Sequence, residues 1–174
     1  MRNRTKEMIM TAMFIAIVFI ATYIRIYIPI GLGTGGLMHI GTFAMFAIAL
    51  KYGKRYGALS GGIGMALFDI ASEWAIWAPG TLIVRLLAGY VVGRFSESKA
   101  GQGQVMAKNI VAIALGGIVI ITGYFLYEAF ALGIGLVAIS SAVGNLVQII
   151  IGAFALFILP SLPELEMDLE NAEM

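Results

Sequence analysis

The stretch MIMTAMFIAIVFIATYIRIYI, residues 8–28, is apolar throughout except for one charged residue, Arg25. A helix needs about 20 apolar residues to cross the hydrocarbon core of a bilayer, so this run predicts a membrane span. The basic residues before it, Arg2, Arg4 and Lys6, also fit a cleavable signal peptide. However, the run is long for a signal peptide and lacks a clear cleavage site. We therefore interpret it as the first span.

The composition of the whole chain points to the same class of protein. Of its 174 residues, 60% are hydrophobic and 12% are charged, and the mean hydropathy is +0.95. Soluble domains carry about 25% charged residues, and disordered chains combine low hydrophobicity with high net charge. The net charge is +1, without a basic tract, which argues against nucleic-acid binding. With no cysteine and one histidine, we expect neither a metal site nor a cofactor.

Further apolar segments, separated by short breaks, predict an all-α integral membrane protein. We expect one domain over residues 1–174, a bundle of six transmembrane helices, with an acidic tail at 160–174. The expected spans are 8–28, 37–51, 57–72, 79–95, 109–131 and 136–159. Pro79 suits the first turn of the fourth span, where its missing N–H costs nothing. The second to fourth spans are short for a bilayer, so five spans with a re-entrant segment is an alternative.

The distribution of basic residues predicts the orientation of the bundle. Lys and Arg concentrate in cytoplasmic loops. If the N-terminus is inside, every basic residue except Arg25 and Arg85 faces the cytoplasm, whereas the opposite orientation places nearly all of them outside. We therefore expect both termini, and the acidic tail, to be cytoplasmic.

Polar side chains within the spans gather near the ends that this topology places outside. Such groups are costly in a bilayer and are candidates for function. The candidate substrate-binding residues are His39, Asp69, Glu73, Trp74, Trp77, Arg85, Tyr124, Glu128, Asn145 and Gln148. We expect Arg85 to pair with Asp69 or Glu73, and a stripe of small and polar residues on the sixth span to face the bundle. Together these residues predict a pocket that takes a small, aromatic, polar molecule from outside.

Each of these residues also has an ordinary structural explanation. The aromatic residues could form a belt at the membrane interface, and Arg85 with Asp69 could be a structural ion pair. Asn145 and Gln148 could hydrogen-bond neighbouring helices, and His39 could lie at the interface or cap a helix. Their convergence at one depth favours the pocket.

Two further motifs consist of small residues. The segment GLGTGG, residues 31–36, matches G-x-G-x-x-G in form but lacks the strand and helix of a dinucleotide site. We interpret its glycines as a mobile external lid, with a plain flexible loop as the alternative; they are Gly31, Gly33, Gly35 and Gly36. Ala12 and Ala16 lie four residues apart in the first span and form a flat patch where another helix can dock.

Three stretches between Gly36 and Phe95 resemble the substrate-binding S components of energy-coupling factor (ECF) vitamin transporters. They are HIGTF (39–43), YGALSGGIGMALFD (56–69) and WAPGTLIVRLLAG (77–89). They are most similar to the branch that includes riboflavin, hydroxymethylpyrimidine and pyridoxine carriers. Two positions depart from the family pattern: Thr42 stands where relatives often carry Asp, and Arg85 where many carry Lys. These departures leave the substrate open.

The resemblance implies a transport subunit, not an enzyme. Such a subunit captures a vitamin from outside a bacterial cell with high affinity. It delivers the vitamin across the plasma membrane through a transmembrane coupling subunit and two cytoplasmic ATP-binding subunits. In this family the motif at Ala12 and Ala16 docks the coupling subunit. The sequence itself has no P-loop motif G-x-x-x-x-G-K-[ST], so ATP hydrolysis falls to other subunits.

Two other classes of function stay open at the level of sequence. An autonomous small-molecule transporter or channel should show internal repeats, and none is convincing here. A membrane-embedded enzyme is disfavoured because the chain has a lone His39, no cysteine and no acidic cluster spaced for metal-dependent chemistry.

Overall fold

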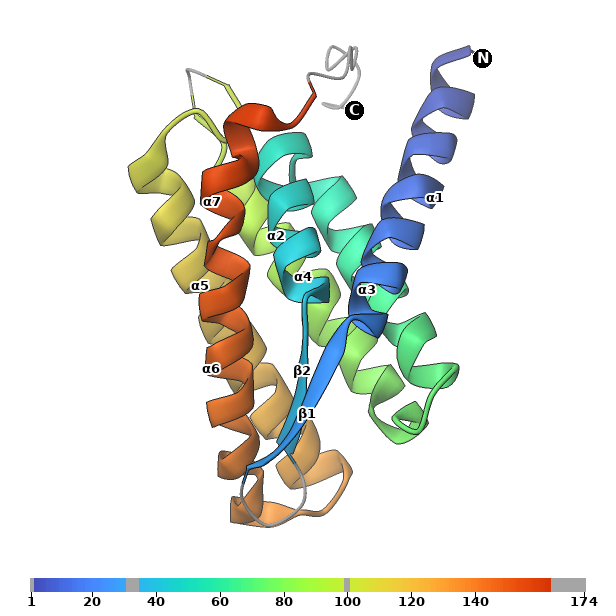
Figure 1. Cartoon of the computed structure of the whole chain (residues 1–174), viewed down its shortest axis with the longest axis vertical. Helices are drawn as coiled ribbons and strands as arrows, with labels where there is room; N and C mark the ends of the chain where they lie inside the picture. The colour runs from blue at the N-terminus through green and yellow to red at the C-terminus, as the bar shows by residue number, and fades with distance from the viewer. Residues whose placement is uncertain (1, 31–34, 99–100, 164–174) are drawn as a thin grey trace.

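A computed structural model describes residues 2–30, 35–98 and 101–163 of the chain (Figure 1). Long helices run up and down, and one two-stranded hairpin crosses the front of the bundle. The main helices are α1 (Arg2–Tyr23), α2 (Gly41–Tyr52), α3 (Lys54–Ile70), α4 (Ala78–Phe95), α5 (Met106–Leu126), α6 (Ile139–Ala153) and α7 (Ala155–Ile158). Short helical turns are η1 (Ala75–Trp77), η2 (Tyr127–Ala131), η3 (Gly135–Ala138) and η4 (Leu159–Ser161), and the strands are β1 (Arg25–Ile30) and β2 (Gly35–His39).

The connections divide between the two ends of the bundle. The start of α1, the α2–α3 junction, the α4–α5 loop and the end of α7 lie together, and we call this the terminus end (Figure 1). The hairpin, η1 and the α5–α6 connection lie at the opposite end, which we call the pocket end. At the terminus end Gln102 anchors its loop by donating hydrogen bonds to the carbonyls of Ala49 and Gly93 at 3.3 and 2.9 Å.

Helix α2 forms the centre of the bundle. It packs against α1, α3, α4 and α6, and nearly all of its residues are buried, including Met45, Phe46 and Leu50. A helix surrounded by other helices can be apolar on every side. The all-apolar sequence of residues 43–50 therefore fits its central place.

Helix α3 packs closely on its neighbours through glycines. A Cβ at Gly61 would collide with Met45 of α2, one at Gly62 with Leu86 of α4, and one at Gly64 would crowd the Ile15 carbonyl of α1. The same stretch brings α3 and α4 into backbone contact, because a Cβ on Gly89 would collide with the Gly57 carbonyl. Small residues permit this close helix approach in membrane proteins. The glycine-rich stretch that begins at Gly61 is therefore buried packing surface.

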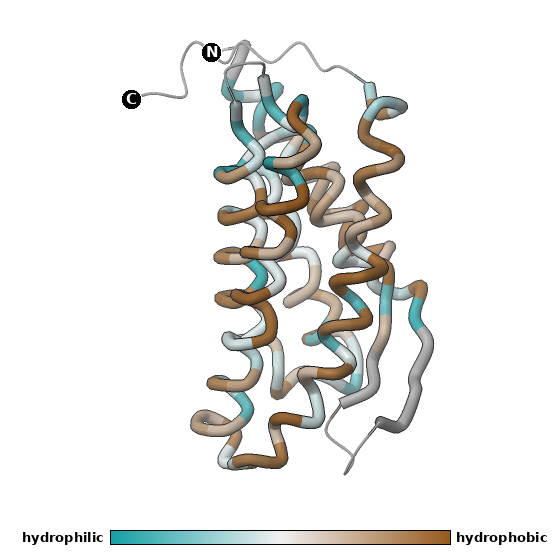
Figure 2. Tube along the Cα trace, turned by 90° about the vertical axis from the view of Figure 1, so that its left-hand side faces the viewer, coloured by the Kyte–Doolittle hydropathy of each residue, from teal (hydrophilic) through white to brown (hydrophobic). Residues whose placement is uncertain are grey.

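The outer surface of the bundle is apolar. Large hydrophobic side chains are exposed on α1, α4, α5 and α6, and Figure 2 shows hydrophobic segments along the helices with hydrophilic ones gathered near the terminus end. Four helical segments are long and apolar enough to cross a membrane: Arg4–Tyr23, Ala75–Phe95, Met106–Ala131 and Gly135–Ser161. A water-soluble monomer rarely exposes so large an apolar surface. The prediction of a helical bundle is thus confirmed, with four segments that have the length and hydropathy of membrane spans.

The expected first span is wrong at its C-terminal end. Helix α1 ends at Tyr23, and Arg25–Ile30 forms strand β1, which pairs antiparallel with β2 from Arg25↔His39 to Ile30↔Gly35. The register is irregular between Tyr27 and Ile30, where Pro29 has no N–H to donate to the ladder. The expected second span, 37–51, likewise begins as strand β2 and becomes helical only at Gly41. Hydropathy alone cannot separate a strand from a helix in a short apolar run.

We expect Gly89→Ala to destabilise the protein, because the added Cβ meets the Gly57 carbonyl and forces α3 and α4 apart. Overpacking of this kind costs about 1–3 kcal/mol of unfolding free energy. The measurement is the midpoint of thermal denaturation in detergent micelles. Leu87→Ala, on the exposed side of the same helix, is the control and should leave the midpoint nearly unchanged. Equal midpoints for both variants would contradict the close α3–α4 contact.

Candidate functional site

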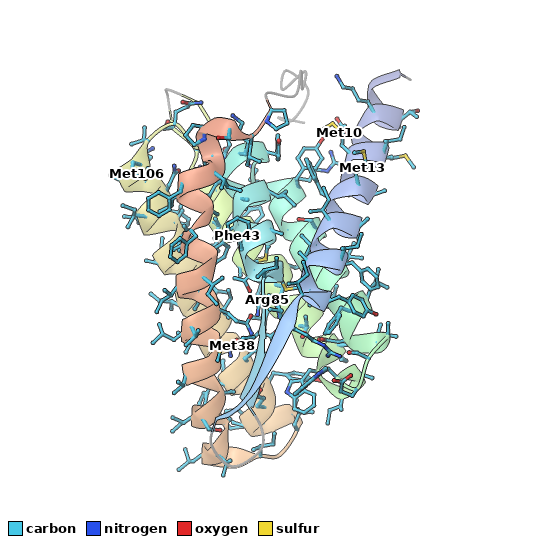
Figure 3. The ribbon with its side chains drawn as sticks, viewed as in Figure 1. Met10, Met13, Met38, Phe43, Arg85 and Met106 are labelled. Carbon is cyan, nitrogen blue, oxygen red and sulfur yellow. The ribbon has the colours of Figure 1, made fainter. Side chains whose placement is uncertain are left out.

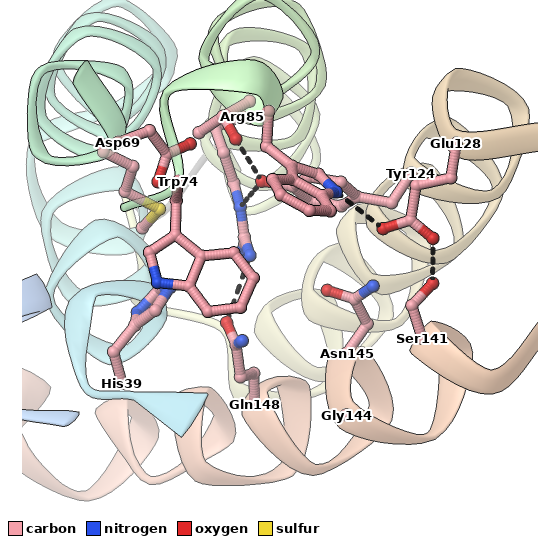
Figure 4. A pocket seen from close by; sticks show the side chains of 13 residues that line it. His39, Asp69, Trp74, Arg85, Tyr124, Glu128, Ser141, Gly144, Asn145 and Gln148 are labelled. Atoms are coloured by element: carbon pink, nitrogen blue, oxygen red, sulfur yellow. Dashed lines mark hydrogen bonds between the residues drawn. The ribbon is translucent and has the colours of Figure 1, made fainter. Parts of the chain in front are cut away.

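A cavity of about 70 Å³ lies inside the pocket end of the bundle. Four helices and the segments that connect them contribute its walls (Figure 4). Its lining residues are His39, Met65, Asp69, Trp74, Trp77, Thr81, Arg85, Tyr124, Glu128, Ser141, Gly144, Asn145 and Gln148. The cavity therefore combines charged and amide groups with two indole rings inside an otherwise apolar bundle.

Arg85 holds the centre of this site (Figure 3). It lies two turns into α4 and is 1% exposed. Its Nη1 donates to Thr42 Oγ1 of α2 at 2.9 Å, its Nη2 to Gln148 Oε1 of α6 at 3.1 Å, and its Nε to the Tyr124 hydroxyl of α5 at 3.2 Å. Thr42 also donates to Gln148 Oε1 at 3.0 Å. One guanidinium thus joins four helices.

A chain of hydrogen bonds leads from Arg85 through Tyr124 to Thr81, beside Asp69. The Tyr124 hydroxyl, which accepts from Arg85, donates to Thr81 Oγ1 at 2.9 Å. Asp69, at the end of α3, lies close enough to Thr81 and to Arg85 to interact with both, but it forms no ion pair with Arg85. The Arg85 guanidinium also lies 5.2 Å from the centre of the Tyr124 ring, a cation–π contact. The Arg85 guanidinium therefore interacts with the Asp69 carboxylate across the site without contacting it.

Glu128 is placed by a π-helical turn at the end of α5. Residues Tyr127–Ala131 form this turn, in which the Leu132 amide donates to the Tyr127 carbonyl at 3.1 Å. Such turns are rare and frequently occur at functional sites. Each Glu128 oxygen is already occupied: Oε1 accepts from Trp77 Nε1 at 3.1 Å and Oε2 from Ser141 Oγ at 2.5 Å. The carboxylate is fixed against the wall of the cavity.

Two tryptophans lie beside the cavity at the pocket end. The rings of Trp74 and Trp77 are 5.1 Å apart, and Figure 4 shows the Trp74 indole in front of the Arg85 guanidinium. His39, at the end of β2, is buried and lines the cavity below Trp74 in the same view. These rings give the site the flat apolar surfaces that a planar ligand requires.

The structure brings together every candidate substrate-binding residue except Glu73. The Glu73 side chain is 64% exposed and pairs with Arg25 at 3.0 Å. Hydrogen bonds from its own backbone and from Arg25 hold the pKa of Glu73 below its usual range. The expected pairing of Arg85 with Asp69 or Glu73 is wrong, because neither carboxylate lies within ion-pair distance of Arg85. Asp69 stays in the wall of the cavity without an ion pair, and Glu73 pairs with Arg25 of β1.

The other predicted elements lie away from the cavity. Of the four lid glycines, Gly35 and Gly36 belong to strand β2, while Gly31 and Gly33 lie outside the described residues. Ala12 and Ala16 are exposed on one side of α1. The expectation that the stripe on the sixth span faces the bundle is confirmed; its members Ser141, Asn145, Gln148 and Gly152 are all buried on α6.

Sequence reasoning missed several residues of the site. Thr42 was noted only as a departure from a family pattern, yet it accepts from Arg85. Helical spacing could have identified two of them, because residues four apart share a helix face. Thr81 lies one turn before Arg85 on α4, and Met65 lies one turn before Asp69 on α3. Gly144 lines the cavity because α6 packs beside it, and the sequence carries no signal for this position.

The site can recognise a polar molecule but shows no arrangement for metal chemistry. Within the described part of the chain no group of three or more His, Asp or Glu side chains could hold a metal ion. What the cavity offers is a buried guanidinium, an amide from Asn145 and two indole rings tilted against each other. These groups fix orientation by hydrogen bonding and ring contact, as is usual in small-molecule sites.

Comparisons with known proteins agree with this geometry. Residues 2–161 match the family model described as "ECF-type riboflavin transporter, S component". The chain is also 32% identical over 101 residues to an "Uncharacterized protein in gap 3'region" of Pyrococcus woesei. That match covers 58% of the chain and 63% of the relative's length, which is less than two thirds of it.

We expect Thr42→Val to destabilise the bundle without changing side-chain volume much. The substitution removes the acceptor of Arg85 Nη1 and the donor to Gln148, and a buried group left unpaired costs about 1–3 kcal/mol. The measurement is the denaturation midpoint in detergent. Thr122→Val is the control, because the Thr122 hydroxyl donates to carbonyls of its own helix, those of Ile118 and Val119. If Thr42→Val is as stable as Thr122→Val, the Arg85 network does not hold the helices together.

Proposed function

The chain belongs to the ECF-type riboflavin transporter S component family, and from this premise we propose that the cavity at its pocket end binds a small vitamin or vitamin precursor. Members of this family are membrane-embedded substrate-binding subunits of transporters, not enzymes. The observation that carries the proposal is the cavity around Arg85, a polar site built inside an apolar bundle. The proposed ligands are of the hydroxymethylpyrimidine, pyridoxine or riboflavin type.

The size of the cavity favours the smaller of these ligands. Pockets for drug-sized molecules have volumes of about 300 Å³ or more, whereas this cavity has about 70 Å³. A ligand therefore fits only if side chains around the cavity move, and a single ring requires less movement than a tricyclic flavin. Trp74 is the side chain best placed to move, because it comes from the short connection between α3 and η1.

We propose that the pocket end faces outward and the terminus end faces the cytoplasm. Every basic residue except Arg25 and Arg85 lies in the segments that meet at the terminus end or in the loop between α4 and α5. This distribution is typical of cytoplasmic loops. With this orientation the cavity takes its ligand from outside the cell, and both termini are cytoplasmic.

The same proposal includes six crossings, although α2 and α3 are short. At 1.5 Å per residue, the 12 residues of α2 span only about 18 Å, against about 30 Å for the hydrocarbon core. Strand β2 continues from α2 toward the pocket end and packs against α6. Backbone that is neither helix nor closed barrel is tolerated at membrane depth where protein covers it. The second crossing is therefore β2 together with α2.

Helix α1 is the proposed docking surface for a transmembrane coupling subunit. Of the four long apolar segments it is the least buried. Its exposed side carries Ala12 and Ala16 among larger exposed residues such as Met13 and Ile17. Two alanines one turn apart leave a shallow groove into which a partner helix fits. The chain has no P-loop motif, so two cytoplasmic ATP-binding subunits would drive transport.

The test of binding is to purify the protein and identify what it carries. We expect one unchanged small molecule per chain by mass spectrometry of the extracted ligand. Asn145→Ala and Arg85→Ala should each raise the Kd of that molecule at least about tenfold, because each removes a polar contact. Leu146→Ala, on the exposed side of α6, is the control. Unchanged affinity in both cavity variants would place the binding site elsewhere.

The docking surface is tested separately from binding. We expect Ala12→Trp and Ala16→Trp to reduce uptake to background in cells that contain the coupling and ATP-binding subunits. A bulky indole would fill the groove that the partner helix needs. Ligand affinity of the purified variants should stay at the wild-type value. Val143→Trp, at an exposed position on α6, should retain uptake; normal uptake in the α1 variants would exclude this surface.

A further inference from the structure

The connection between α3 and η1 carries Trp74 into the wall of the cavity. Trp74 lines the cavity and is itself partly exposed, so at this point one side chain separates the cavity from the surface (Figure 4). The cavity has a volume of only about 70 Å³, so a ligand enters only if part of this wall moves. Whatever holds Trp74 in place therefore controls access to the site.

The Trp77 side of η1 is fastened to the π-helical turn that follows α5. Trp77 Nε1 donates to Glu128 Oε1 at 3.1 Å, and the Tyr127 hydroxyl donates to the Ile76 carbonyl at 2.7 Å. Trp74 precedes η1 and lies on the other side of these attachments. The segment that can swing away from the cavity is therefore the one that carries Trp74.

Glu73 attaches this segment to the hairpin. Its carboxylate meets the Arg25 guanidinium at two points: Oε1 lies 3.0 Å from Nη1, and Oε2 accepts from Nη2 at 3.4 Å. The Trp74 side chain also lies close enough to this carboxylate to interact with it. Two-point pairing of arginine with a carboxylate fixes direction as well as distance. The position of Trp74 is therefore tied to Arg25 through Glu73.

Arg25 is itself fixed to another wall of the cavity. It is the first residue of β1 and pairs in the hairpin with His39, which lines the cavity. Its guanidinium lies 5.1 Å from the centre of the buried Phe68 ring, a cation–π contact. Neither partner of the ion pair lines the cavity. The pair instead joins the wall that carries His39 to the wall that carries Trp74.

From these contacts we propose that the Arg25–Glu73 ion pair is a latch, which holds Trp74 over the cavity and opens before a ligand enters or leaves. Arg25 and Glu73 are positioning residues, because they act through Trp74 and do not touch the ligand. The inference rests on the proposed function in one respect, since it takes this cavity to be the ligand site.

The strength of the ion pair fits this role. The Arg25 and Glu73 side chains are 29% and 64% exposed, and exposed pairs shift an equilibrium by no more than about fivefold. A fully buried pair is much harder to separate, because breaking it leaves an uncompensated charge away from water. The latch therefore favours the closed cavity and still opens readily.

The test measures opening without a ligand. The chain has no cysteine, so Asn145→Cys places a single thiol in the wall of the cavity, at a buried position. Methyl methanethiosulfonate, a neutral reagent, modifies a buried thiol at a rate proportional to the open fraction. In this background we expect Glu73→Gln and Arg25→Gln each to raise the rate about two- to fivefold. Arg25→Lys, which keeps the charge, should react at close to the parent rate.

Controls separate opening of the latch from other effects. The two Gln substitutions change the local charge in opposite directions, so an effect of charge on thiol reactivity would move their rates oppositely. The double variant should react no faster than either single variant, because the same pair is broken only once. Glu7→Gln breaks the 2.9 Å ion pair with Arg55 at the terminus end and should leave the rate unchanged. A cysteine at Leu136, which is 77% exposed, should react equally fast with and without Glu73→Gln.

Several results would overturn the latch. They are unchanged rates in both Gln variants, additive increases in the double variant, and an equal increase in Glu7→Gln, which indicates general loosening. Because the paired side chains are exposed, the denaturation midpoints of the Glu73 and Arg25 variants should stay near that of the parent protein. If a ligand co-purifies but the rates do not change, the proposed function stands and the latch is wrong. If the rates rise as expected but no ligand co-purifies, the latch controls the cavity and the proposed function fails.

Discussion

The bundle is organised around one charge in an apolar interior. The guanidinium of Arg85 needs hydrogen-bond acceptors, which the hydrocarbon of a bilayer does not supply. Thr42, Tyr124 and Gln148 do so from three different helices. Because each acceptor must be within about 3 Å of the same planar group, the relative positions of α2, α4, α5 and α6 are tied together. Each polar interaction between helices in a membrane contributes only modestly to stability. The main effect of this network is therefore specificity, because only one arrangement of the helices makes all of its hydrogen bonds.

The two ends of the bundle have different structural tasks. At the terminus end, the hydrogen bonds of Gln102 hold a loop onto the ends of the helices, and glycines keep α3 against α4. At the pocket end, a hairpin, short helical turns and a π-helical turn replace regular helices. Irregular backbone at that end exposes side chains such as Trp74, Trp77 and Glu128 to one shared space. A rigid end and an adaptable end suit a protein that takes up a ligand from one side.

The candidate site was largely predictable because polarity inside a membrane is rare. In an apolar chain, His39, Asp69, Arg85 and Asn145 are conspicuous, and helical spacing already placed them at one depth. Their pairing was not predictable. Asp69 and Arg85 are opposite charges at similar depth, yet they form no ion pair, and Arg85 donates its hydrogen bonds to neutral oxygens. Pairing depends on where side chains point across helix interfaces, and spacing along one helix does not contain that information.

The sequence by itself determined a membrane-embedded helical bundle, the buried face of α6 and the set of polar residues near one end. Hydropathy and helical periodicity are local properties, so they can be read from the chain. Only the tertiary structure decided that Arg25–Ile30 pairs with β2 as a hairpin and that Glu73 leaves the site to bind Arg25. It also decided that Arg85 donates to neutral oxygens and forms no ion pair with Asp69. These outcomes depend on contacts between segments that are distant in sequence. Which partner a side chain binds there is decided by the geometry of the folded chain, and local sequence preferences do not determine it.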